Sequence, residues 1–262
     1  MNFRQKLEAA IAKNNSLLCI GLDTNIDKIP KNLLKDEDPM FAFNKAIIDA
    51  THDLVCCYKA NMAFYLASGV GGFAALEMSI AYLKEHYADI PIILDGKWAD
   101  IENTSQSYAK MVFDVVGADA ATVNPYIGSD ALEPFLTRKD KGVVVLCRTS
   151  NPGAWEIQDV KVDGQPLYEY IAKKVDSKWN TYNNCLLVVG ASPQEIGKVR
   201  EIVGDMFLLV PGVGMQGGDL EATLKAGLRN DRSGLIIHSA RAIIFASNNK
   251  DFAAKAREEG EI

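Results

Sequence analysis

The sequence lacks several features that would assign it to a specialised class of protein. No apolar run in its 262 residues is long enough to span a bilayer, so a membrane protein is not expected. Lys and Arg are not clustered and the formal net charge is −6, so neither a nucleic-acid nor a membrane surface is indicated. Residues 1–15 have the pattern of an amphipathic helix, without the apolar core and cleavage site of a signal peptide. These absences favour a cytoplasmic protein.

Cysteine and histidine are too scattered to predict a disulfide framework or a metal site. The five cysteines lie in apolar stretches without CxxC spacing, and they are Cys19, Cys56, Cys57, Cys147 and Cys185. We expect them to be buried thiols in a reducing compartment. The three histidines, His52, His86 and His238, show no HxH or HExxH spacing, so structural or surface roles are expected. No bound transition metal is predicted.

The sequence does contain a regular alternation of strand-like and helix-like segments. Eight short runs rich in Val, Ile and Leu lie at residues 17–23, 54–61, 91–97, 120–125, 142–147, 185–190, 206–212 and 234–239. Such runs are typical of parallel strands that are buried on both faces. Helix-like stretches between them include residues 40–53, 72–86, 103–116, 168–180, 193–203 and 219–226. Eight β/α units in a chain of this length predict a (β/α)₈ TIM barrel, with residues 1–262 forming a single domain.

The longest segment without a predicted helix or strand is the connection 149–165, which follows the fifth strand. In a barrel it would rise from the end at which active sites are built. A flexible lid and an ordinary surface excursion both fit its sequence.

Charged residues interrupt the carboxyl ends of the first three predicted strands. Asp23 follows the first strand, Lys59 lies on the second, Asp95 and Lys97 lie on the third, and Asp100 comes just beyond. Asp95 and Lys97 are two residues apart, so in an extended chain they face the same side. One such charge could belong to a solvated loop, but this many from three strands at one end indicate a functional array.

This array suits a particular kind of chemistry. Neighbouring carboxylates favour the cationic form of a lysine, which is then a poor general base but can donate a proton to a very basic centre. Carboxylates beside such a lysine can also repel a carboxylate of the substrate. The pattern therefore favours a reaction that expels CO₂ and leaves a carbanion to be protonated.

A second constellation is the glycine-rich segment 211–219, PGVGMQGGD. It contains a GxGxxG spacing, but a dinucleotide-binding fold would place this spacing near the start of a domain, with an acidic residue about twenty positions further on. Here it follows the seventh predicted strand, and only one strand remains. Glycine loops after strands seven and eight of a barrel commonly hold a phosphate through backbone N–H groups. Arg241, just past the eighth strand, could add a bidentate partner. A purely surface role for this arginine is less favourable, because a cation at a helix start opposes the helix dipole.

These segments together resemble one family. Residues 95–104, DGKWADIENT, resemble the D-x-K-x-x-D-I-x-x-T signature of orotidine 5′-phosphate decarboxylases, and residues 211–219 resemble that family's PGVGxQGGD loop. Further matches, in the family's order along the barrel, lie at residues 21–23, 58–61, 63–65, 148–153 and Arg241. Lys59-Ala60-Asn61 and the long connection 149–165 resemble the longer-chain branch of the family, and Ala240 stands where some members have glycine.

The resemblance implies an enzyme that converts orotidine 5′-phosphate to UMP and CO₂ in pyrimidine biosynthesis, without a cofactor. Lys97 would protonate C6 of the pyrimidine as CO₂ leaves. Asp95 would lie against the substrate carboxylate and hold Lys97. Asp100 and Thr104 would reach into the active site of the neighbouring subunit, so a homodimer with shared sites is implied.

The resemblance also implies a set of substrate-binding residues. Asp23, Lys59 and Asn61 would bind ribose hydroxyls or position the charged array. Ser150, with Thr149 nearby, would contact the pyrimidine. The resemblance further implies that Gln216 would bridge base and phosphate, and that Arg241 would bind the phosphate together with backbone N–H groups of the loop.

Three other functions share part of this pattern. Magnesium-dependent keto-sugar phosphate decarboxylases and hexulose-phosphate synthases share the D-x-K-x-x-D core, but they need an acidic metal ligand at the end of the second strand. Here that position carries Lys59 and Asn61, which cannot supply a hard anionic oxygen. A non-catalytic nucleotide-binding module would leave the charged array unexplained. A chain of 262 residues has no room for a phosphoribosyltransferase domain, so a bifunctional UMP synthase is not expected.

Overall fold

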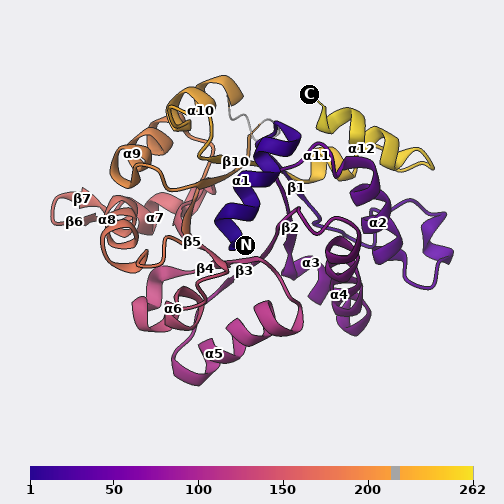
Figure 1. Ribbon diagram of the computed structural model, residues 1–262, viewed down its shortest axis with the longest axis horizontal. Helices are drawn as coiled ribbons and strands as arrows, with labels where there is room; N and C mark the ends of the chain where they lie inside the picture. The colour runs from indigo at the N-terminus through magenta and orange to yellow at the C-terminus, as the bar shows by residue number, and fades with distance from the viewer. Residues whose placement is uncertain (214–218, 262) are drawn as a thin grey trace.

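Eight parallel strands close into a barrel in the computed structural model, which describes residues 1–213 and 219–261 (Figure 1). The strands are β1 (Leu18–Gly21), β2 (Cys57–Asn61), β3 (Ile92–Trp98), β4 (Ala120–Val123), β5 (Gly142–Arg148), β8 (Cys185–Val189), β9 (Leu208–Pro211) and β10 (Leu235–Ser239). Their order around the barrel is β1-β10-β9-β8-β5-β4-β3-β2. The predicted (β/α)₈ barrel is therefore confirmed, and each of the eight predicted strands corresponds to one barrel strand.

Helices surround the barrel. They are α2 (Pro39–Thr51), α3 (Met62–Leu66), α4 (Gly69–His86), α5 (Glu102–Lys110), α6 (Ser129–Leu136), α8 (Leu167–Lys174), α9 (Pro193–Val203), α10 (Leu220–Gly227), α11 (Arg241–Ile244) and α12 (Phe252–Gly260). Local sequence sets several helix starts: Asp38 caps α2, with Pro39 at the first helical position, and Asp219 caps α10. The predicted helices 103–116 and 168–180 both end in a π-helical turn, Met111–Val115 and Val175–Trp179.

The hydrophobic core has two layers, one inside the barrel and one between strands and helices. Strand residues that point inward, such as Cys57, Val144 and Leu186, fill the interior with α1 (Phe3–Asn14). The outer layer joins the opposite faces of the strands to the helices. All five cysteines are free and buried, as expected from the sequence. No helix among the described residues is long and apolar enough to cross a membrane.

Helix α1 covers the amino-terminal end of the barrel, and it runs across the middle of the view in Figure 1. Phe3 and Leu7 are its buried residues nearest the barrel interior. A Cβ at Gly142, where β5 begins, would lie 2.4 Å from the Phe3 ring, so glycine allows the helix to pack this closely. The opposite end of the barrel remains available for a site.

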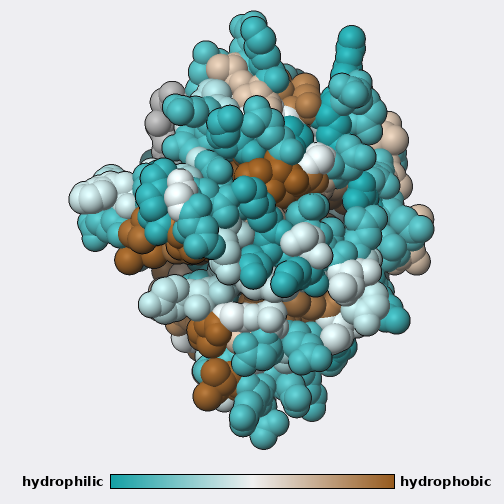
Figure 2. Space-filling view, turned by 90° about the vertical axis from the view of Figure 1, so that its left-hand side faces the viewer, coloured by the Kyte–Doolittle hydropathy of each residue, from teal (hydrophilic) through white to brown (hydrophobic). Residues whose placement is uncertain are grey.

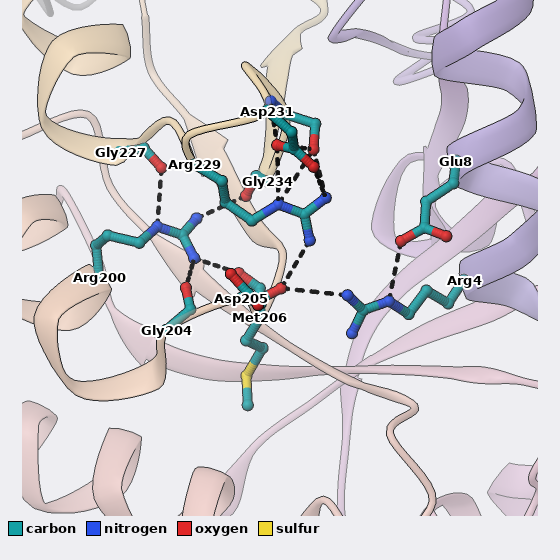
Figure 3. Close-up of polar contacts among 11 residues, drawn as sticks. Arg4, Glu8, Arg200, Gly204, Asp205, Met206, Gly227, Arg229, Asp231 and Gly234 are labelled. Atoms are coloured by element: carbon teal, nitrogen blue, oxygen red, sulfur yellow. Dashed lines mark hydrogen bonds and ion pairs between the residues drawn. The ribbon is translucent and has the colours of Figure 1, made fainter.

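Arginines tie the loops together at this covered end (Figure 3). The Arg200 guanidinium of α9 donates hydrogen bonds to the carbonyls of Gly204, Met206, Gly227 and Gly234. Burial, with the nearby charge of Arg229, lowers the pKa of Arg200 to about 10, so it stays cationic at neutral pH. One side chain thus satisfies carbonyls from the segments around α9, β9, α10 and β10.

The connection 149–165 contains secondary structure, which the sequence did not indicate. It forms a 3₁₀ turn (Pro152–Ala154), the short helix α7 (Trp155–Gln158) and a two-stranded hairpin of β6 (Lys161–Val162) and β7 (Gln165–Pro166). Figure 2 views the side on which α7, α8 and this hairpin lie in Figure 1, and most of that face is hydrophilic.

Candidate active site

An alternating array of carboxylates and ammonium groups lies at the carboxyl ends of β1, β2 and β3. The Lys59 Nζ lies 3.0 Å from Asp95 Oδ2 and 3.6 Å from Asp23 Oδ1. The Lys97 Nζ lies 2.8 Å from Asp95 Oδ1. Lys59 and Asp95 are buried, whereas the Lys97 side chain is 46% exposed. The structure therefore brings four of the predicted residues together, with Lys97 on the accessible side.

The two carboxylates of the array have pKa values shifted in opposite directions. Burial acts to raise the pKa of Asp95, but the charges of Lys59 and Lys97 outweigh it and hold this pKa well below its usual range. Burial raises the pKa of Asp23, and the Lys59 charge offsets this only in part. Burial also opposes the charge on Lys59, but Asp95 and Asp23 together raise its pKa. Asp95 is thus a fixed anion between two cations.

The backbone departs from a regular strand at the end of β3. Lys97 has a left-handed φ of 51°, and the register between β3 and β4 shifts between Leu94 and Trp98. Asp95 and Lys97 therefore do not meet as neighbours on one side of a regular extended strand, which is what their spacing predicted. The bulge re-aims the lysine toward the carboxylate, a common use of β-bulges beside active sites.

Thr122 of β4 holds this bulge in place, and it is a site residue that no sequence motif predicts. Its hydroxyl donates to Asp95 Oδ1 at 2.7 Å and accepts from the backbone N–H groups of Gly96 and Lys97. One buried hydroxyl thereby fixes the carboxylate and the backbone of the lysine together. A polar residue on an otherwise apolar strand was the available signal.

His238 of β10 is the second residue whose place the sequence did not reveal. Its imidazole leans over Gly21, where a Cβ would lie 2.7 Å from His238 Nε2, so glycine at this position makes room for it. Nε2 is buried and has no hydrogen-bond partner among the described residues. Burial, with the charge of Lys59, lowers the pKa of His238 well below its usual value. The ring is therefore neutral at physiological pH and adds no charge to the array.

Three other predicted site residues, Asn61, Asp100 and Thr104, make no ion pair with the charged array in the described part of the chain. The Asn61 side chain caps α3 by accepting from the Ala63 N–H at 3.1 Å, and its backbone hydrogen-bonds Asp23. Asp100 is half-buried and accepts from the adjacent Ile101 N–H, and no ion pair joins it to Lys97 in the described chain. Thr104 is exposed in the first turn of α5. Asp100 and Thr104 thus lie outside the charged array of their own chain.

A cavity of about 160 Å³ adjoins the array at the ends of β9 and β10. Its lining includes Asp23, Gly212, His238, Ser239 and Arg241. The Arg241 side chain is exposed and has no hydrogen bond or ion pair with the described residues. Gln216 and the rest of residues 214–218 lie outside the described residues.

The loop after β5 borders a second cavity, of about 250 Å³, whose lining includes Thr149, Ser150, Gly190 and Gly212. A Cβ at Gly190 would lie 2.8 Å from Ser150 Cβ, so glycine lets the two loops approach closely. Gly212 lines this cavity and the one beside Arg241, which places the two cavities next to each other.

Larger grooves lie on the outside of the barrel. The groove between α5 and α6 has a volume of about 690 Å³, but the charged residues that line it, such as Glu102, Asp130 and Glu133, are exposed. These exposed charges are screened by solvent, unlike the buried charges of the array. The chemistry therefore belongs to the smaller cavities beside the array.

Comparisons with known proteins point to one family. Residues 16–256 match the sequence model of the orotidine 5′-phosphate decarboxylase/HUMPS family. The orotidine 5′-phosphate decarboxylase of Cellvibrio japonicus is 52% identical over 261 residues, which are 98% of this chain and 94% of that protein. The solved structure of Leishmania donovani OMP decarboxylase has a TM-score of 0.85 and 37% identity, and covers 98% of this chain and 95% of its own. Leishmania donovani UMP synthase matches all of this chain at a TM-score of 0.88 and 38% identity, but over only 55% of its own length.

Proposed function

Because the chain belongs to the orotidine 5′-phosphate decarboxylase/HUMPS family, we propose that it decarboxylates orotidine 5′-phosphate to UMP and CO₂ without a cofactor. The observation that carries this proposal is the Asp95 carboxylate, fixed as an anion between the ammonium groups of Lys59 and Lys97. An enzyme with this site serves pyrimidine biosynthesis. The five buried free thiols fit a reducing compartment, so we place it in the cytoplasm.

In the proposed reaction, the bond between C6 of the pyrimidine and the carboxylate breaks and its electron pair remains on C6. CO₂ leaves, and Lys97 donates a proton from Nζ to C6. The lysine is then neutral and regains its proton from solvent, which its 46% exposure permits. Asp95 holds Nζ in place and stabilises the cationic lysine before the transfer, since an opposite charge at 2.8 Å favours the charged form.

The cavities beside the array accommodate the rest of the substrate in this proposal. Asp23 and Lys59 bind the ribose, with Asn61 supporting Asp23 through its backbone. The phosphate binds Arg241 and the N–H groups of the glycine loop, in the manner of barrels that hold phosphate after strands seven and eight. The pyrimidine lies toward Thr149 and Ser150, and Gln216 contacts it together with the phosphate.

The HUMPS branch of the same family offers the rival function, a metal-assisted reaction of a sugar phosphate. Against it stands the chemistry of the residues at the ends of β2 and β3, where a metal would need free oxygen ligands. Asp95 accepts from Lys59, Lys97 and Thr122, so its oxygens are already occupied by cationic and neutral donors. Lys59 itself stands where a metal site would need an oxygen ligand. No group of three or more His, Cys, Asp or Glu residues in the described chain is arranged to hold a metal ion.

We further propose that the working unit is a homodimer with shared active sites. Among the described residues, no hydrogen bond or ion pair joins Asp100 or Thr104 to the charged array, although both belong to the same signature segment. Supplied across a two-fold axis, Asp100 would complete the array of the partner subunit.

The direct test follows the absorbance of orotidine 5′-phosphate with the purified protein. We expect turnover that persists unchanged after exhaustive dialysis against a chelator. Absence of turnover would refute the proposed activity, and a chelator-induced loss that Mg²⁺ restores would favour the sugar-phosphate branch.

A further inference from the structure

The connection 149–165 folds back onto the loop that leaves β5. Its helix α7 ends at Gln158, and the side chain of this half-buried glutamine reaches Thr149. Gln158 Oε1 accepts from the Thr149 backbone N–H at 2.8 Å, and Gln158 Nε2 donates to Thr149 Oγ1 at 2.8 Å. A single carboxamide therefore satisfies both the backbone and the side chain of one loop residue.

The direction of these hydrogen bonds follows from the donors available. A backbone N–H can only donate, so it orients the Gln158 oxygen toward Thr149 and turns the amide nitrogen toward the hydroxyl. The Thr149 hydroxyl, which accepts from Gln158, donates onward to Asn151 Oδ1 at 2.6 Å. Gln158, Thr149 and Asn151 thus form a chain of hydrogen bonds with one polarity, which an isosteric carboxylate could not reproduce.

Two further contacts fix the same loop. Arg148 Nη1 donates to the Thr149 carbonyl at 2.9 Å and to Gln158 Oε1 at 3.3 Å. On the other side, Ser150 packs against Gly190 so closely that a Cβ there would lie 2.9 Å from the Ser150 backbone nitrogen. Ser150 is therefore held between an anchored neighbour and the β8 loop, at the edge of the cavity beside Arg148 and Gly212.

From this geometry we propose that Gln158 is a positioning residue for the pyrimidine end of the substrate. It acts through Thr149 and sets the backbone of Ser150, and it does not itself touch the substrate. The inference rests on the proposed function, because that function places the pyrimidine at this loop. It also gives the long connection a definite role, which is to carry the residue that locks the loop.

Gln158→Ala tests this role through ligands that do or do not contain the pyrimidine. We expect UMP affinity and kcat/KM for orotidine 5′-phosphate to fall about tenfold, as for the loss of one or two hydrogen bonds. Ribose 5-phosphate, which lacks the base, should bind within twofold of its affinity for the unmodified protein. Gln165→Ala is the matched control, since Gln165 lies on the same connection but accepts from Lys173 of α8.

A double-mutant cycle with Thr149→Val measures how much of the effect of Gln158 passes through the Thr149 hydroxyl. Gln158→Ala should cost less in UMP affinity in the Thr149→Val background, where only the bond to the Thr149 backbone N–H remains to be lost. Gln158→Glu should fall between the unmodified protein and Gln158→Ala, because the carboxylate can still accept from the Thr149 N–H but cannot donate to Oγ1.

Two outcomes would overturn the inference: unchanged UMP affinity in Gln158→Ala, or equal losses for UMP and ribose 5-phosphate. Strictly additive losses in the cycle would assign the whole effect of Gln158 to its bond with the Thr149 backbone N–H. Failure of the proposed function is seen separately, because the unmodified protein would then neither bind UMP nor decarboxylate orotidine 5′-phosphate. Circular dichroism of each variant confirms that folded protein is compared.

Discussion

At the residue scale, the candidate site holds unlike charges at short distances, and two of them are buried. Lys59 and Asp95 are almost fully buried, and each offsets the desolvation of the other. Lys97 shares the carboxylate but remains partly exposed. This division suits one lysine to a fixed electrostatic role and the other to proton transfer.

Lys97→Ala should abolish nearly all turnover, lowering kcat by about 10⁴-fold, the upper end of the range for a general acid. UMP binding should change by less than about tenfold, because the ribose and phosphate contacts remain. Steady-state kinetics and UMP titration measure the two effects. Lys198→Ala, at an exposed ion pair with Glu201 on α9, is the control and should leave both unchanged. Substantial turnover by Lys97→Ala would contradict the proposed proton donor.

Asp23 should determine part of the acidic side of the pH profile. Its pKa is raised by burial, so it takes up a proton at a higher pH than an ordinary aspartate, whereas Asp95, with its lowered pKa, stays ionised there. As pH falls through the raised pKa, Asp23 becomes neutral and its attraction to Lys59 is lost. As the pH is lowered, kcat/KM should therefore begin to decline before the pH reaches about 3.9, the usual pKa of aspartate.

Asp23→Asn isolates this titration. The variant should have a lower kcat/KM at neutral pH, by about ten- to a hundredfold, as for one hydrogen bond to a charged group. Its acidic limb should keep only the part that comes from the substrate phosphate, whose second pKa is about 6. A profile of kcat/KM against pH with the same acidic limb as the unmodified protein would rule out Asp23 as its source.

At the element scale, the two ends of the strands serve different purposes. The register shift at the end of β3 and the one between Leu146 and Arg148 on β5 both occur where site residues lie. Irregular backbone is tolerated there because neighbouring polar groups, such as the Thr122 hydroxyl, satisfy the exposed N–H donors. At the opposite end, α1 and the arginine contacts close the barrel.

Arg200→Met tests the stabilising role of that closed end. Methionine keeps much of the side-chain volume but leaves four carbonyl groups without their donor. The free energy of unfolding should fall by about 3 kcal/mol, and the melting temperature by roughly 6–12 °C. kcat/KM at 25 °C should stay within twofold, because the site lies at the other end of the barrel.

Thermal unfolding and steady-state kinetics measure these two quantities, with Arg232→Met as the exposed control. An unchanged melting temperature in Arg200→Met would show that its hydrogen bonds are replaced by water. A large loss of activity in the folded variant would show that the two ends of the barrel are coupled.

At the scale of the whole molecule, the proposed dimer makes each active site depend on two chains. Lys97→Ala and Asp100→Ala homodimers should each be nearly inactive. When they are mixed and re-equilibrated in equal amounts, half of the dimers are hybrids, and one site in each hybrid carries neither substitution. Roughly a quarter of full activity should return, which the decarboxylation assay measures directly.

The outcome differs if Asp100 serves its own chain, because every site of a hybrid then keeps one substitution and no activity returns. Subunit exchange can be followed with differently tagged chains. A mixture that is fully scrambled yet inactive would refute the shared site.

The sequence by itself determined the barrel and most of the site's composition. Eight apolar runs alternating with helices can bury both faces of their strands in a parallel sheet covered by helices, and eight such units in a chain of this length favour a closed barrel. The eight strands form where those runs lie. Charged residues at strand ends gather because parallel strands present their carboxyl ends at one edge of the barrel. The grouping of Asp23, Lys59, Asp95 and Lys97 was predictable for that reason.

Only the tertiary structure decided how these residues meet. The left-handed backbone at Lys97, the Thr122 hydroxyl beneath it and the His238 imidazole over Gly21 depend on contacts between strands that sequence spacing does not encode. The fold of the 149–165 connection has the same cause. Its helix is a single turn and its strands have two residues each, so they are too short to show a periodic pattern in the sequence. Gln158 reaches Thr149 because the connection folds back onto the end of β5, a contact that the sequence does not predict.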